Sequence, residues 1–156
     1  MAYYLKYRCM VSMRAEVEFS RWISIGRGSR ISSYCRIKAA GPLTIGRDVS
    51  ITNFSCIAAG SSGIEIGDDC LISPNVTILG SNYQYGRLDK PIRGQGITSK
   101  GIRIGNNVWI GAGVIVLDGS VIEDGTIVAP HSVVSSHLPT NTICQGNPAK
   151  VIFTRR

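Results

Sequence analysis

The 156-residue sequence lacks any apolar stretch of the roughly 20 residues that a helical membrane span requires. Its first ten residues, MAYYLKYRCM, also lack the uninterrupted apolar run of a secretory signal. These absences argue against a membrane-spanning protein and predict a cytoplasmic one. A chain of this length is expected to form a single domain, residues 1–156.

Cysteine and histidine are too few, or too irregularly spaced, to build a disulfide framework or a metal site. The five cysteines are an odd number, and none of them forms a C-x-x-C pair. The two histidines, His131 and His137, are not spaced like a metal-binding pair. No P-loop or catalytic triad pattern is present. We therefore expect buried thiols, solvent-exposed histidines and no metal site.

Acidic residues are scarce: 10 Asp and Glu stand against 17 Lys and Arg, a formal net charge of +7. The basic residues are scattered singly, without aromatic residues between them and without a nucleic-acid-binding motif. Nucleic acid is therefore not expected as a partner. The positive charge suits phosphorylated small molecules at least as well.

Residues 104–139 contain the most regular pattern of the chain. They read IGNNVW, IGAGVI, VLDGSV, IEDGTI, VAPHSV and VSSHLP, six blocks that each open with Ile or Val. A period of six fits neither an α-helix nor an isolated strand. It is typical of a hexapeptide β-helix, in which three blocks close one triangular coil and the opening aliphatic residues form the core.

Small residues often follow the opening aliphatic residue, as at Gly105, Gly111 and Ala129. We expect them beside tight corners, where a bulky side chain would clash and glycine can take a positive φ. The aliphatic period extends backwards through Ile66, Ile45 and Ile25, each followed by glycine. This predicts about five to six coils. Leu5, Val11 and Val17 keep the six-residue spacing and predict an irregular first coil within residues 1–24.

Every departure from the period follows the third block of a coil. Most departures add two or three residues, but residues 79–101 form a long polar insertion with Arg87, Lys90, Arg93 and Lys100. A loop of this length on a compact scaffold is usually functional or disordered, and we expect a functional one. Residues 140–156 are predicted to cap the prism, with Val151, Ile152 and Phe153 forming a last apolar strand.

The motifs IGNNVWIGAGVIVLDGSVI and GNPAKVI resemble those of the hexapeptide-repeat acyltransferases, a family that includes galactoside and maltose acetyltransferases. Within it, the segment DKPIRGQGITSKGIRIG is most similar to the surface-polysaccharide O-acetyltransferases. The resemblance covers roughly residues 25–152. It implies a left-handed parallel β-helix, a homotrimer, and acetyl-CoA and a carbohydrate acceptor bound between adjacent prisms.

The resemblance also implies a catalytic position that this chain fills unusually. The family's general base is a histidine at the start of the long loop, and LISPNVTILGSNY places Tyr83 there. Asn53, in ITNFSC, matches the asparagine that orients the acceptor or the base. A phenol, with an ordinary pKa of about 10, is ionised to only about one part in a thousand at pH 7. A general base contributes roughly 10²–10⁴-fold in rate, so the replacement matters.

On the cofactor side, the resemblance implies a groove for the pantetheine arm beside Ala112, Ala129 and Pro130. Lys150 matches a cationic position near the nucleotide phosphates. Ser135 and Ser136 stand where the family often has Thr-Lys, which removes one phosphate contact. Each of these residues is otherwise explained as a corner residue required for folding.

Together these observations predict an acetyl-CoA-dependent acetyltransferase that modifies a sugar hydroxyl or amine in surface-polysaccharide or lipopolysaccharide biosynthesis. The missing histidine leaves several alternatives open. The acceptor can be an amine that needs no base, or a residue such as His131 can act from a neighbouring subunit. The chain can also be a non-catalytic trimeric scaffold or binding protein. The acceptor and the acyl chain length are not specified by the sequence.

Overall fold

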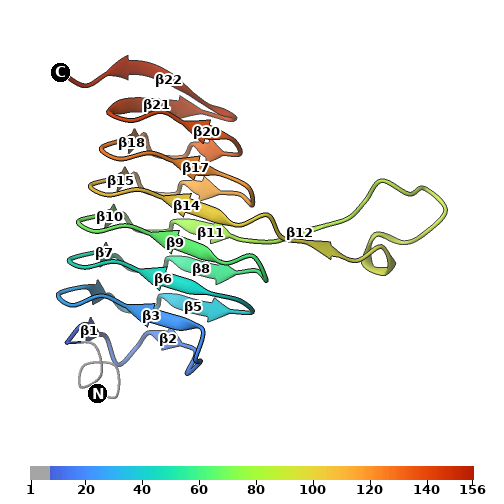
Figure 1. The fold of residues 1–156 in the computed structure, drawn as a ribbon, viewed down its shortest axis with the longest axis horizontal. Helices are drawn as coiled ribbons and strands as arrows, with labels where there is room; N and C mark the ends of the chain where they lie inside the picture. The colour runs from blue at the N-terminus through green and yellow to red at the C-terminus, as the bar shows by residue number, and fades with distance from the viewer. Residues whose placement is uncertain (1–7) are drawn as a thin grey trace.

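The chain winds into a stack of triangular coils, a parallel β-helix, in a computed structural model that describes residues 8–156. Successive coils rise from the N-terminal to the C-terminal end of the stack, and one long loop stands out from its side (Figure 1). Apart from a short 3-10 turn, η1 (Ile92–Gly94), the described elements are strands. The all-β parallel β-helix with one long inserted loop, predicted from the sequence, is confirmed. No helix in residues 8–156 has the length and apolar character needed to cross a bilayer.

Three sheets form the sides of the prism. Sheet A contains β1 (Met10–Val11), β4 (Arg30–Ile31), β7 (Ser50–Ile51), β10 (Leu71–Ile72), β15 (Trp109–Ile110), β18 (Ile127–Val128), β21 (Thr142–Gly146) and β22 (Ala149–Thr154). Sheet B contains β2 (Glu16–Val17), β5 (Arg36–Ala39), β8 (Cys56–Ala59), β11 (Thr77–Leu79), β16 (Ile115–Val116) and β19 (Val133–Val134). Sheet C contains β3 (Ile23–Ile25), β6 (Leu43–Ile45), β9 (Ile64–Ile66), β14 (Ile102–Ile104), β17 (Val121–Ile122) and β20 (His137–Leu138).

A complete coil takes one strand from sheet C, then one from sheet A, then one from sheet B. The described residues form five such coils, from β3 to β19, with a partial coil (β1 and β2) before them and another (β20 and β21) after them. We call the three edges of the prism corner CA, corner AB and corner BC, after the sheets that the chain joins there.

The core is a set of aliphatic columns along the prism axis. In sheet A, Ile51 lies opposite Ile72, Ile72 opposite Ile110, and Ile110 opposite Val128 in the neighbouring coils. These residues are at most 1% exposed. The inward-facing residue of every block is thus stacked on its counterpart, as the six-residue period predicts.

The expected role of glycine at the second position of a block needs correction. Gly105 and Gly111 do not have positive φ values; positive φ occurs at the fourth position, for example at Asn107 and Gly113. A Cβ added to Gly111 would lie 2.7 Å from the backbone nitrogen of Pro130 in the next coil. The second position is therefore small because stacked coils approach each other closely there.

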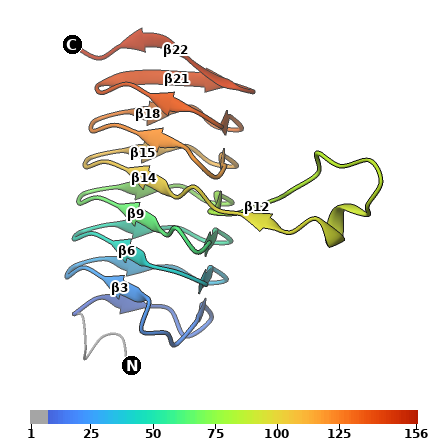
Figure 2. The ribbon, with the colours of Figure 1, turned by 45° about the vertical axis from the view of Figure 1, so that its right-hand side comes forward.

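All the insertions fall at corner BC, where the chain passes from sheet B to sheet C. The large insertion leaves the prism after β11 and returns at β14. Inside it, β12 (Asn82–Tyr83) pairs antiparallel with β13 (Ile97–Thr98), so the base of the loop is a short two-stranded ladder. A second view shows the same loop extending away from the stack (Figure 2).

The two ends of the stack differ. At the N-terminal end, Val11 and Val17 pair with Ile31 and Ile37 and are half-buried. Leu5, expected to begin this coil, lies outside the described residues. At the C-terminal end, β22 pairs antiparallel with β21 and extends sheet A. Val151, Ile152 and Phe153 on β22 stay 45–66% exposed.

Candidate functional site

Corner AB gathers most of the residues expected to bind substrate. Asn53, Ala112 and Pro130 each lie two residues beyond an inward-facing residue of sheet A, and these inward-facing residues are stacked in register. The three side chains therefore occupy one column along the prism, with Pro74 at the level between Asn53 and Ala112. Asn53 and Pro130 are exposed, whereas Ala112 is half-buried.

A further small side chain, Ala129, precedes Pro130 at the upper part of this corner. Ala129 is half-buried, and its backbone N–H donates to the carbonyl of Cys144 in the next coil at 2.8 Å. Ala112 and Ala129 have short side chains, so no long side chain projects from these two positions of the corner. A flexible chain such as pantetheine can lie beside such small residues.

Lys150 belongs to the same corner. It lies on β22 opposite Gln145, near the turn of residues 146–149. The N–H of Gly146 donates to the hydroxyl of Ser132 at 3.1 Å, which fixes this turn beside the end of corner AB. The Lys150 side chain is exposed, so its ammonium group can contact phosphates bound along the corner.

His131 also occupies corner AB and takes a left-handed backbone conformation with φ of 59°. Its ring lies over Gly113, because a Cβ on that glycine would be only 2.6 Å from Nδ1. The residue is exposed, as expected for a corner histidine. His137 instead lies on sheet C, with its Nε2 3.4 Å from Oε1 of Glu123.

Tyr83 lies at a different corner. It is on β12, opposite Ile97, at the base of the long loop where the loop leaves corner BC. Its side chain is 55% exposed. Tyr83 lines a cleft of about 450 Å³ together with Tyr85, Lys100 and Asp118. The sequence-predicted base position therefore faces an open, polar cleft.

Asp118 is a residue of this cleft that the sequence analysis missed. Its carboxylate accepts hydrogen bonds from the backbone N–H of Lys100 at 2.8 Å and of Gly101 at 3.0 Å. These bonds fix the returning strand of the loop to the prism. The sequence did contain a signal, the Asp-Gly pair of the LDGS block, which is typical of a turn. In the structure this glycine, Gly119, has a φ of 83°.

Ser135, the last predicted cofactor residue, follows β19 at corner BC and is exposed. It therefore lies with Tyr83 at one edge of sheet B, while Asn53, Ala112, Ala129, Pro130 and Lys150 lie at the other edge. One chain does not bring the two sets together. A site containing both requires corner AB of one copy and corner BC of another.

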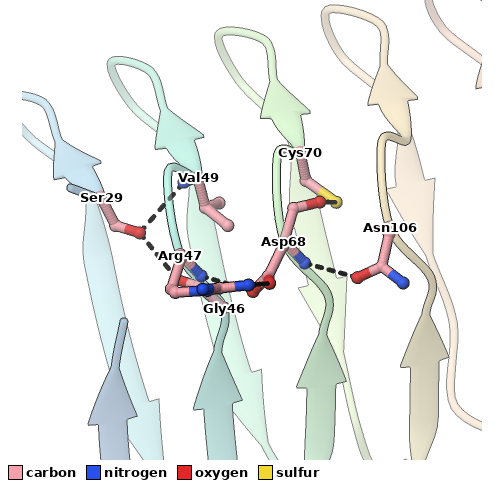
Figure 3. A network of polar contacts seen from close by, with 7 residues as sticks. All are labelled: Ser29, Gly46, Arg47, Val49, Asp68, Cys70 and Asn106. Carbon is pink, nitrogen blue, oxygen red and sulfur yellow. Dashed lines mark hydrogen bonds and ion pairs between the residues drawn. The ribbon is translucent and has the colours of Figure 1, made fainter. Parts of the chain in front are cut away.

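Corner CA carries a polar network of a different kind (Figure 3). Asp68 accepts a hydrogen bond from the backbone N–H of Arg47 at 2.7 Å and pairs with its guanidinium at 2.7 Å. The N–H of Asp68 in turn donates to Oδ1 of Asn106 at 2.8 Å. The side-chain hydrogen bond from Arg47 lowers the pKa of Asp68 below its ordinary value. These contacts join successive coils, so we assign this corner a structural role.

The cysteines do not form a reactive site. Four of the five are buried and Cys56 is half-buried, and none is in a disulfide. Burial raises the pKa of the Cys70 thiol to about 11. Within residues 8–156, no group of three or more His, Cys, Asp or Glu side chains is arranged to hold a metal ion.

Comparison with known proteins supports the reading of the repeats. The family described as bacterial transferase hexapeptide (six repeats) matches residues 101–136. The chain is 32% identical over 143 residues to a probable acetyltransferase of Mycobacterium tuberculosis, covering 91% of this chain and 45% of that protein. It therefore spans about half the length of this relative.

Two further similarities extend over most of the chain. WbbJ of Escherichia coli, named for lipopolysaccharide biosynthesis O-acetyl transfer, is 29% identical over 95% of this chain and 76% of its own length. A mutant of AntD, an N-acyltransferase from Bacillus cereus, was solved with dTDP and coenzyme A. Its structure superposes on this chain with a TM-score of 0.84 at 25% identity, and the superposition covers 95% of this chain and 82% of the AntD chain. The repeats, the fold and these relatives agree: the chain belongs to the hexapeptide-repeat acyltransferase family.

Proposed function

We propose that this protein transfers an acyl group, most simply acetyl, from acetyl-CoA to a sugar. The observation that carries the proposal is the column of small residues at corner AB that ends at Lys150. Its short side chains leave room for a pantetheine arm along the prism, and Lys150 supplies a cation for the nucleotide phosphates. The structure of AntD contains coenzyme A on the same fold, which supports this donor.

The acceptor that we propose is a sugar hydroxyl or amine in surface-polysaccharide biosynthesis. WbbJ is named for O-acetyl transfer in lipopolysaccharide biosynthesis, and AntD is an N-acyltransferase solved with dTDP. Both chemistries fit an exposed, polar cleft beside Tyr83 and Lys100. We propose that the reaction takes place in the cytoplasm, where the donor acetyl-CoA is available.

The active assembly that we propose is a homotrimer. Corner AB holds Asn53, and corner BC of a second copy would supply Tyr83. The loop of residues 79–101 supports this assembly, because it extends from the prism and carries exposed apolar side chains. Those side chains are Tyr85 at 69%, Leu88 at 101%, Ile92 at 56% and Ile97 at 61% exposure. Contact with an adjacent subunit would remove this apolar surface from water.

The chemistry proposed for this site is direct transfer. The acceptor oxygen or nitrogen attacks the thioester carbonyl, the C–S bond breaks, and coenzyme A leaves as the thiol after taking up the acceptor's proton. Asn53 would orient the acceptor through its amide, and Tyr83 would contact the attacking group at the position of the general base. An amine acceptor needs less help from a base than a hydroxyl, because its free lone pair is already nucleophilic.

A turnover assay tests the proposal. Purified protein, acetyl-CoA and a panel of hexoses, amino sugars and nucleotide-linked sugars are incubated while thiol release is followed, and acetylated products are identified by mass spectrometry. We expect acceptor-dependent thiol release with one class of sugar. Absence of release across hydroxyl and amine acceptors, in protein that binds coenzyme A, would contradict the transfer reaction.

The second candidate is a non-catalytic trimer that keeps the prism as a scaffold or binding module. What favours it is that the sequence resemblance puts Tyr83 where the family has its general-base histidine. A scaffold would show neither coenzyme A binding nor turnover, whereas the proposed enzyme shows both.

A further inference from the structure

Positive charge is concentrated at the N-terminal end of the prism. Residues 8–38 contain seven of the 17 basic residues but only two of the 10 acidic ones. The acidic residue Glu16 is already paired with Arg36 at 3.0 Å and Lys38 at 3.3 Å. The remaining basic residues of this end form no ion pair with another described residue: Arg8, Arg14, Arg21, Arg27 and Arg30.

Four of these arginines occupy the three corners of the first levels of the stack, whereas Arg30 lies on β4 of sheet A. Arg27 follows β3 at corner CA, and the carbonyl of Arg8 accepts a hydrogen bond from Gly28 at the same corner. Arg14 lies at corner AB, where its carbonyl accepts a hydrogen bond from Tyr34. Arg21 lies at corner BC, between β2 and β3. The positive charge therefore surrounds the end of the prism.

Large apolar side chains are exposed at the same end. They are Met10 at 52%, Met13 at 101%, Phe19 at 84% and Trp22 at 43% exposure. Met10 lies on sheet A, Met13 at corner AB, and Phe19 and Trp22 at corner BC. The guanidinium of Arg21 lies 4.8 Å from the centre of the Trp22 ring. We call these four residues, together with Arg8, Arg14, Arg21 and Arg27, the N-terminal rim.

A surface that combines exposed apolar groups with unpaired cations fits one class of partner especially well. Apolar side chains enter the interfacial region of a bilayer, and Lys and Arg attract anionic headgroups. Tryptophan and arginine are suited to this boundary because each has an apolar part and a polar part. Another copy of the rim would be repelled by like charge, so end-to-end pairing of two prisms is disfavoured.

We infer that the N-terminal rim docks the protein end-on to an anionic lipid bilayer. The axis of the prism then stands away from the membrane, and the rim contacts the headgroups. Met13 and Phe19 enter the interface while Arg21 and Arg27 contact lipid phosphates. The docking concerns a surface outside the proposed active site. In the proposed trimer with parallel prisms, three rims would face the membrane together and reinforce one another.

Sedimentation with vesicles tests this inference. The full chain is mixed with vesicles of phosphatidylcholine alone, or of phosphatidylcholine with phosphatidylglycerol, at low and at high salt. We expect binding to the anionic vesicles only, weakened by salt. Each basic residue near an anionic surface contributes about fivefold to partitioning, so Arg21→Glu with Arg27→Glu should reduce binding at least about 25-fold. Met13→Ser with Phe19→Ser should reduce it at least about tenfold.

A matched control separates the rim from general electrostatic attraction. Lys90→Glu with Arg93→Glu makes the same change in charge on the long loop and should leave vesicle binding within about twofold of the unmodified chain, because the loop is remote from the rim. Thermal unfolding and light scattering confirm that each variant is folded and keeps the assembly of the unmodified chain. Equal loss in the loop control, equal binding to neutral vesicles, or no binding to anionic vesicles would overturn the inference.

Displacement by the soluble polyanion heparin, with no effect of the two serine substitutions, would indicate a polyanion site instead and would also overturn the inference. The vesicle experiment contains neither acyl donor nor acceptor. Its failure would therefore leave the proposed transfer reaction intact, and failure of the turnover assay would leave the docking result intact.

Discussion

At the residue scale, the proposed chemistry depends most on Tyr83. If this side chain merely replaces a lost base, Tyr83→His should raise acetyl-CoA turnover with a hydroxyl acceptor, by up to roughly 10²–10⁴-fold. Since the side chain is 55% exposed on a short ladder, the substitution should leave the fold intact. Thiol release under saturating donor measures the effect.

Tyr83→Phe serves as the matched control because it removes only the phenolic oxygen. A histidine variant that is slower than the unmodified protein, together with a phenylalanine variant that is inactive, would mean that the tyrosine hydroxyl has a role of its own. The replaced-base explanation would then be wrong.

Gly111 illustrates how closely the coils are stacked. Gly111→Ala would place its Cβ 2.7 Å from the nitrogen of Pro130 and 2.8 Å from the carbonyl oxygen of Val128. Because backbone atoms of the next coil must shift, we expect a loss of roughly 1–3 kcal/mol in the free energy of unfolding. The melting temperature should fall by roughly 2–12 °C.

The control is Gly94→Ala in the long loop, where a Cβ would meet no atom within 4 Å. It should leave the melting temperature nearly unchanged. Equal stability of the two alanine variants in thermal unfolding would refute the steric explanation for the small second position of each block.

The sequence predicted the inward-facing residues well because one physical rule, burial of an aliphatic side chain every six residues, applies to all of them. Residues such as Ile51 and Ile110 follow it without exception. The same rule could not identify Asp118. Its carboxylate accepts backbone N–H groups from the long loop, and the six-residue period does not describe that loop. Positive φ was also predicted at the wrong position, since the period does not reveal where the chain turns.

At the scale of elements, corner CA holds the coils together through side chains that reach the backbone of the preceding coil. Asp68 accepts from the N–H of Arg47, Asn106 from the N–H of Asp68, and Asp124 from the N–H of Asn106 at 2.6 Å. Each bond supplies a partner to a corner N–H that turns away from the strand ladder. The ladder of side chains thereby supplements the parallel strand pairing.

The Asp68 pair predicts a dependence of stability on pH. The Arg47 side chain lowers the pKa of Asp68 in the folded protein below the ordinary value of 3.8. The Arg47–Asp68 pair therefore stabilises the folded protein at pH values above the pKa of Asp68 in the unfolded chain. This stabilisation is lost as the pH falls through the lower pKa of Asp68 in the folded protein. Urea unfolding from pH 6 down to pH 2 should show this loss, and high salt should reduce the effect because the pair is solvent-exposed.

Asp68→Asn is the matched comparison, since asparagine keeps an oxygen for the Arg47 N–H but carries no charge. The variant should be less stable than the unmodified protein at pH 6, and the difference should vanish at pH 2. Glu16 and Asp89 also titrate in this window, but they contribute equally to both proteins. A difference in stability that stays constant across the pH range would contradict the assignment.

The elements divide clearly into those that the sequence could predict and those that it could not. Interruption of the period located the insertion between Leu79 and Ile102, which the structure places at corner BC. The pairing of β12 with β13 was not predictable, because two residues a side carry no recognisable alternation. Likewise, the C-terminal segment was expected to form a strand, but not its antiparallel pairing along sheet A.

At the scale of the molecule, the predicted site residues lie at two edges of sheet B rather than around one cleft. Asn53 and Lys150 are at corner AB, whereas Tyr83 and Ser135 are at corner BC. A single-chain sequence pattern could not resolve this division, because it gives the level of each residue in the stack but not which edges of neighbouring copies meet. The division makes oligomerisation a condition of the proposed function.

Light scattering coupled to size-exclusion chromatography measures the assembly. The proposed trimer should have about three times the 16.8 kDa mass of one chain. Charged substitutions on the exposed apolar loop, such as Ile92→Glu and Ile97→Glu, should weaken the trimer by removing apolar contacts. Gly94→Ala on the same loop is the control and should stay trimeric. A monomeric mass for the unmodified chain at micromolar concentration would contradict the assembly.

Calorimetric titration with coenzyme A tests the central claim, that corner AB binds an acyl-CoA donor. We predict saturable binding, one coenzyme A per chain, which Ala112→Trp abolishes by placing a bulky side chain at corner AB and Lys150→Glu weakens by opposing the phosphates. Arg27→Ala at corner CA, away from corner AB and the long loop, is the control and should bind like the unmodified protein. No binding at millimolar coenzyme A by a folded protein would contradict the account.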